Sequence, residues 1–105
     1  MTTFDEREKE FEARFKHDEE LRFKVTARRN RLLGLWAAER MGLAGDGAQA
    51  YAKQIVEAEF AGGDPHVVGK IVADLAAKSQ SCTPAQVQFQ LDHFAEQAKQ
   101  QIMKE

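Results

Sequence analysis

Residues 21–43, LRFKVTARRNRLLGLWAAERMGL, contain a broad apolar stripe at helical spacing. Arg28 and Glu39 occupy positions within this stripe. An apolar face of this width is typical of a helix that packs on a core. Gly34 inside the helix costs about 1 kcal/mol relative to alanine, which indicates close approach of a neighbouring helix. The stripe consists of Leu21, Val25, Leu32, Leu35, Trp36 and Leu43.

The preceding segment has an apolar row of its own. Phe4, Phe11 and Phe15 share one narrow stripe, and the T-x-x-E pattern of residues 3–6 predicts a capping box, so that a helix begins at Phe4. Phe15 lies about 100° from the line through Leu32, so we expect the Phe row to point away from the core face. The polar residues 16–20, KHDEE, mark a bend, a fray or a domain edge.

Three further helices follow in the sequence. Glycines at 42, 45 and 47 end the long first helix, and Asp46 is a candidate N-cap for a helix over about 47–61. Gly62-Gly63 and Asp64-Pro65 separate it from a helix over about 65–78. A capping box at Thr83-Pro84-Ala85-Gln86 begins the last helix, about 84–103. No strand pattern is visible, so we predict an all-α fold, a small four-helix bundle.

The inward faces of these three helices are also predicted by their spacing. Phe89 lies off the stripe of the last helix. The expected core residues are Tyr51, Ala52, Ile55, Val56 and Phe60, then Val67, Val68, Ile71, Val72 and Leu75, and finally Val87, Leu91, Phe94, Ala98 and Ile102.

Composition limits the function classes. The 105 residues suffice for one domain, and a net charge of −2 argues against general affinity for nucleic acid or anionic membranes. No apolar run is long enough to span a membrane and no signal peptide opens the chain, so a cytoplasmic location is expected. Residues 1–31 hold 17 of the 32 charged side chains, and their surface therefore differs from the rest.

Signatures of catalysis are missing from the sequence. Three isolated histidines and a single cysteine, Cys82, give no metal-ligand spacing, and no phosphate-binding glycine loop or nucleophile elbow occurs. The acidic pairs in 5–20 lie on a solvated face without a pocket that would raise a pKa. We predict a non-enzyme without a metal site or a required cofactor.

One basic cluster leaves two alternatives open. Arg28, Arg29 and Arg31 precede Trp36, and such a group could contact the phosphates of a nucleotide, ATP or ADP, or of a nucleic acid. The alternative is structural: the stems of Arg28 and Arg29 pack beside the core, and their guanidinium groups pair with Glu39 or with another helix.

Three stretches resemble the zeta subunit of alphaproteobacterial F-type ATP synthases. They are MTTFDERE at the N-terminus, ARRNRLLGLWAAE at 27–39, and the pattern of Gly45, Asp46, Ala48, Ala50, Tyr51 and Ala52. The resemblance is dense over roughly residues 1–60. It implies a regulatory protein that blocks ATP hydrolysis by the catalytic head and acts on the alpha, beta and rotor gamma subunits at the cytoplasmic face of the membrane. Some members are also similar to nucleotide binders.

The resemblance further implies a division of labour within the chain. Residues 1–19 would be a frayed or mobile inhibitory arm that inserts as a helix at a catalytic αβ interface and works as a one-way pawl, and 20–105 would be the bundle. A competing hypothesis is that the Phe row packs back on the bundle. The candidate partner-binding residues are Phe4, Asp5, Arg7, Glu8, Phe11, Arg14, Phe15 and Lys16.

Overall fold

The computed structural model describes residues 3–105, with side chains described from residue 6 onward. That part of the chain forms four helices and no strand, so the predicted all-α fold of four helices is confirmed. The chain is divided into helices differently from the prediction. The long first helix is broken into two, and two of the later helices are joined into one element. The helices are α1 (Thr3–His17), α2 (Glu19–Arg40), α3 (Gly45–Ala77) and α4 (Pro84–Met103).

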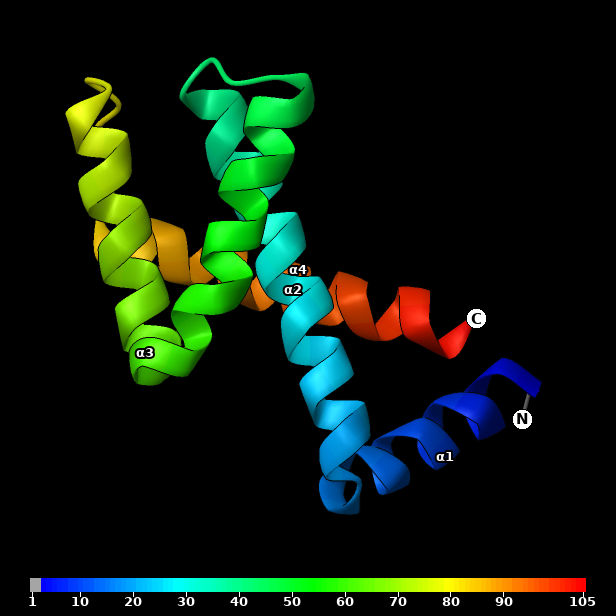
Figure 1. The fold of residues 1–105 in the computed structure, drawn as a ribbon. Helices are drawn as coiled ribbons and strands as arrows, with labels where there is room; N and C mark the ends of the chain where they lie inside the picture. Colours follow the sequence, from blue (N-terminus) through cyan, green and yellow to red (C-terminus); the bar gives the residue numbers. More distant parts are fainter. Residues whose placement is uncertain (1–2) are drawn as a thin grey trace.

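Helix α3 turns back on itself at Gly62-Gly63. Gly63 has φ +71°, a left-handed conformation that favours glycine, and neither residue has helical dihedral angles. The two limbs, 45–61 and 64–77, therefore run side by side as a helical hairpin (Figure 1). Pro65 lies in the first turn of the second limb, where no helical amide donor is needed. The predicted break at these residues is confirmed.

Glycine also ends α2. Gly42 has φ +80°, and the amides of Gly42 and Leu43 donate to the carbonyls of Glu39 and Ala38, the two hydrogen bonds of a Schellman motif. The predicted N-cap at Asp46 is wrong. α3 begins at Gly45, two residues too early for such a cap, so Asp46 lies in the first turn, where its charge favours the helix N-terminus.

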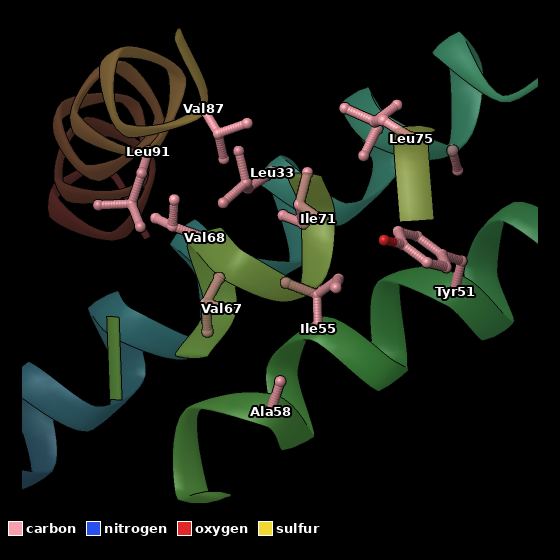
Figure 2. Close-up of a cluster of buried hydrophobic side chains, with 12 residues drawn as sticks. Leu33, Tyr51, Ile55, Ala58, Val67, Val68, Ile71, Leu75, Val87 and Leu91 are labelled. Atoms are coloured by element: carbon pink, nitrogen blue, oxygen red, sulfur yellow. The ribbon is translucent and has the colours of Figure 1, made fainter. Parts of the chain in front are cut away.

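The main core lies between the second half of α2, both limbs of α3 and the first half of α4. In Figure 2, Val87 and Leu91 of α4 point toward Leu33 and Val68. Its buried residues are Leu33, Ala37, Ala38, Tyr51, Ile55, Ala58, Val67, Val68, Ile71, Leu75, Val87 and Leu91.

Gly34 lies where α2 crosses α3. A Cβ atom built on Gly34 would lie 2.7 Å from the Ala52 Cα, so the expected close approach of a neighbouring helix is confirmed. Small residues thus let the two backbones pack closely.

The predicted core differs from the observed one in two details. Leu32 and Trp36 pack against the two clusters but are only partly buried, whereas Leu33, outside the predicted stripe, is fully buried because α3 covers the adjacent side of α2. Phe60 is 70% exposed although it was placed on an inward stripe. It lies in the last turn before the α3 reversal, where the second limb leaves its side chain uncovered.

Candidate functional site

The boundary between α1 and α2 is a single residue, Asp18. Its backbone is extended, and its carboxylate accepts a hydrogen bond of 3.0 Å from the Leu21 amide, capping α2. The amide of Asp18 still donates to the Arg14 carbonyl, which completes the last turn of α1. The predicted change of direction within residues 16–20 is therefore confirmed. Beyond it, α1 turns away from the axis of α2 (Figure 1).

The Phe row of α1 packs on a second, smaller cluster. Phe11 is only 6% exposed, and Phe15 is half-buried beside it with its ring centroid 6.3 Å away. The prediction that these two rings point away from the fold is wrong, because the break at Asp18 lets α1 return toward α4. The side chain of Phe4 lies outside those described. The buried members of this cluster are Phe11, Leu21, Val25, Ala98 and Ile102.

Lys99 of α4 adds a polar contact to this docking. Its Nζ atom lies 4.4 Å from the centroid of the Phe15 ring and 3.6 Å from Glu12 Oε1. The first contact is a cation–π interaction and the second an ion pair, worth together roughly 1 kcal/mol near the surface. These contacts and the small apolar cluster hold α1 in place.

The other arm candidates are exposed or half-buried, or lie outside the described side chains. Arg7, Arg14 and Lys16 are exposed, Glu8 is half-buried, and Asp5 has no described side chain. A hollow of about 600 Å³ separates the outer part of α1 from α2 and α4. Its polar lining consists of Arg7, Glu10, Arg14, Lys24, Lys104 and Glu105. α1 is thus attached to the fold along one narrow side.

The three arginines of the basic cluster contact separate partners. Arg28 donates to Gln101 at 3.0 Å and pairs with Glu105, which Lys24 also contacts at 3.0 Å. The hydrogen bond from Arg28, followed by the one from Lys24, holds the pKa of Glu105 below its usual range. Arg31 is exposed and donates to the Gln49 amide oxygen at 3.3 Å.

Arg29 belongs to a buried network with Asn30. Arg29 Nε donates to Asn30 Oδ1 at 2.9 Å, and Asn30, which has no exposed surface, donates to Glu59 at 2.9 Å. The Arg29 guanidinium also pairs with Glu59 at 3.1 Å and with Asp64 at 2.7 Å. These two carboxylates stand on either side of the Gly62-Gly63 reversal, so the network fixes both limbs of α3 to α2.

The charges of this network shift one another's titration. Burial, and then the hydrogen bond with Asp64, raises the pKa of Glu59. Burial alone would also raise the pKa of Asp64, but the hydrogen bond from Arg29 holds it below its usual range. The structural alternative for Arg28 and Arg29 is therefore the observed one, with acceptors on α3 and α4 in place of Glu39. The residues that sequence reasoning missed, Glu59 and Asp64, are remote in the chain and carry no local signal.

Neither a metal cluster nor a membrane span is found in residues 3–105. That part of the chain brings no three His, Cys, Asp or Glu side chains together as metal ligands. None of its helices is long and apolar enough to cross a bilayer.

The comparisons with known proteins agree with this architecture. The family model for ATPase inhibitor subunit zeta matches residues 1–101 of the chain. The chain belongs to the ATPase inhibitor subunit zeta family. A protein solved by NMR in solution is 39% identical to this zeta-family chain, with a TM-score of 0.70 over 80% of this chain and 96% of the other. The search of curated proteins gave no match.

Membership confirms the resemblance seen in the sequence. An inhibitor subunit is a regulatory protein, in keeping with the prediction of a non-enzyme. The zeta family match includes all of α1 and α2, and therefore both the Phe row and the arginine cluster.

Proposed function

We propose that this chain inhibits ATP hydrolysis by an F-type ATP synthase and that α1 is the inhibitory segment. The observation that carries the proposal is the attachment of α1: it lies outside the main core and is joined to α2 through one extended residue, Asp18. A helix attached in this way can be presented to a partner without disturbing the core. Membership of the ATPase inhibitor subunit zeta family supports an ATPase as the target of this chain.

In the proposed mechanism α1 leaves α4 and inserts at a catalytic αβ interface close to the rotor gamma subunit. Release exposes Phe11 and Phe15, which costs on the order of 3 kcal/mol of apolar burial. The partner interface has to restore that burial, so the same two rings serve the closed and the inserted state. Blocking one direction of rotation and permitting the other would make the arm a one-way pawl.

The exposed basic side chains of α1 fit the same proposal. Arg7, Arg14 and Lys16 are exposed in the docked state and can make polar contacts as the arm approaches the head. The proposal places the chain in the alphaproteobacterial cytoplasm, on the cytoplasmic face of the enzyme. It assigns residues 1–19 to the arm and 20–105 to the body that carries it.

Titration of the purified catalytic head tests the function. The intact chain is expected to slow ATP hydrolysis, and a chain lacking residues 1–17 is expected to leave the rate unchanged because it has no α1. The shortened chain retains Asp18, which caps α2, so its remaining helices should still form. Circular dichroism must show that the shortened chain keeps α2 to α4. Equal inhibition by both chains, or inhibition by neither, would refute the role of α1.

Nucleotide binding remains a prediction. A phosphate site at Arg28, Arg29 and Arg31 would require Arg28 and Arg29 to exchange acceptors, since both already contact carboxylates. Titration with ATP or ADP, followed by Trp36 fluorescence, measures it directly. Salt-dependent binding that is lost in Arg29→Ala would support this site, and a flat titration would exclude it.

A further inference from the structure

An apolar groove lies between α2 and the first limb of α3. Phe23 lines the groove and is 57% exposed. Phe60, 70% exposed, lines the smaller hollow beside it and contacts Phe23, with ring centroids 5.8 Å apart. The groove has a volume of about 520 Å³ and adjoins a smaller hollow of about 40 Å³, and both are lined by Phe23, Ala27 and Val56. A pair of exposed aromatic rings beside an apolar groove is typical of a protein-binding surface.

Apart from their contact with each other, these two rings lie outside the buried clusters of the fold. Neither Phe23 nor Phe60 belongs to the main core or to the cluster beneath α1. Release of α1 would therefore leave the groove unchanged. It is a surface available to a partner in both states of the arm.

The rim of the groove is positively charged. Its lining contains three basic side chains, Lys24, Arg28 and Arg31, and one carboxylate, Glu20. Lys24 and Arg28 share a carboxylate beyond the end of α4, whereas Arg31 contacts only the neutral Gln49 side chain and no carboxylate among residues 6–105. A partner that carries carboxylates beside its apolar residues matches this arrangement.

We propose that the groove binds an amphipathic helix with an acidic edge on the catalytic head, a second contact apart from α1. The identity of this partner rests on the proposed function. A second copy of the chain is the poorer occupant, because it would bring the same excess of cations over carboxylates to the contact. Phe23 and Phe60 would be the anchors, and Arg31 would pair with the acidic edge.

Binding of the full-length chain to the purified head tests the groove. Phe23→Ala/Phe60→Ala is expected to raise the Kd at least about ten-fold, because aromatic anchors dominate such interfaces. Phe89→Ala is the matched control: Phe89 is 68% exposed and lies on α4, so its loss should leave the Kd unchanged. Circular dichroism must show that all variants remain folded, because Phe23→Ala/Phe60→Ala also removes the ring contact between α2 and α3.

Charge reversal supplies an independent arm of the test. Arg31→Glu is expected to weaken binding about ten-fold and to reduce its salt dependence. Lys78→Glu, at an exposed position just beyond α3, should have no effect.

The outcomes separate this proposal from the inhibitory role of α1. An unchanged Kd for the double variant, with inhibition intact, overturns the groove and leaves the role of α1 standing. Binding that depends on Phe23 and Phe60 without any inhibition supports the groove and refutes the proposed function. Absence of binding by the intact chain refutes both. A wild-type dimer that the double variant converts to monomers would overturn the proposal in favour of a second copy.

Discussion

At Gly34 the backbones of α2 and α3 come into contact. In Gly34→Ala the new methyl group would lie 2.7 Å from the Ala52 Cα, so one backbone must shift. We expect a loss of about 1–2 kcal/mol in unfolding free energy, overpacking outweighing the better helix propensity of alanine. Gly69→Ala is the control, since its Cβ would meet no atom within 4 Å. Urea unfolding that shows equal effects of both substitutions would contradict the close approach.

The pair of Arg29 and Asp64 makes stability depend on pH. A carboxyl whose pKa is lowered by folding contributes stability above its ordinary pKa of about 3.9 and loses it as the pH falls. Glu59 acts in the opposite direction, because its raised pKa means that protonation favours the folded state. Asp64 thus accounts for acid sensitivity, and Glu59 partly offsets it.

Asp64→Asn should therefore be less stable at pH 7 and decline less steeply below about pH 4. We expect a loss of about 1 kcal/mol, a figure reduced for solvent screening because the Asp64 side chain is 44% exposed. Asp92→Asn on the exposed face of α4 is the matched control. Unfolding free energies measured from pH 3 to pH 8 check this, and parallel profiles for Asp64→Asn and the unsubstituted chain would count against it.

At the scale of elements, α1 should unfold separately from the rest. A helix of 15 residues is marginal in water, and Phe11 is the buried anchor of α1. In Phe11→Ala we expect fast amide exchange over residues 6–17 with protection retained across α3, and no such change in Phe89→Ala. Hydrogen exchange followed by mass spectrometry measures both. Equal loss of protection in α1 and α3 would show one cooperative unit and refute a separable arm.

Local signals predicted most helix boundaries. The capping box of Thr83 and Gln86 and the break at Gly62-Gly63 depend on neighbouring residues, so the sequence alone is sufficient for both. The direction of α1 is not a local property. It depends on the turn at Asp18 and on packing against Ala98 and Ile102, about 80 residues away. The Phe row can therefore be buried although it is out of phase with the core stripe of α2.

Contacts between residues far apart in the chain also decide the candidate site, and local sequence signals do not predict them. The arginine cluster was recognisable in the sequence, but the acceptors of Arg29 lie 30 and 35 residues away and meet only because α3 reverses. Asn30 carried no sign that it would be fully buried. Phe60 was predicted on an inward stripe and is nevertheless exposed. Periodicity predicts which residues share one face of a helix, but not whether another element covers that face.

At the scale of the molecule, the proposed function requires a body formed by α2, α3 and α4 and an arm, α1, that can detach from it. The main core joins α2, α3 and α4, and the arginine network closes the α3 hairpin on α2. α1 lies beside the end of α4 (Figure 1). Phe11, Phe15 and Lys99 hold it there. In the proposed mechanism inhibition requires the arm to leave α4, so a chain that cannot release it should be inactive.

A reversible lock on α1 tests that requirement most directly. Cysteines at Glu12 and Lys99, whose side chains meet at 3.6 Å, can be joined by a reducible bis-maleimide in a chain that also carries Cys82→Ala. The Cys82→Ala chain given the same treatment is the control. We predict that the locked chain leaves ATP hydrolysis by the catalytic head unchanged and that reduction restores inhibition to the level of the control. Full inhibition by the locked chain would contradict it.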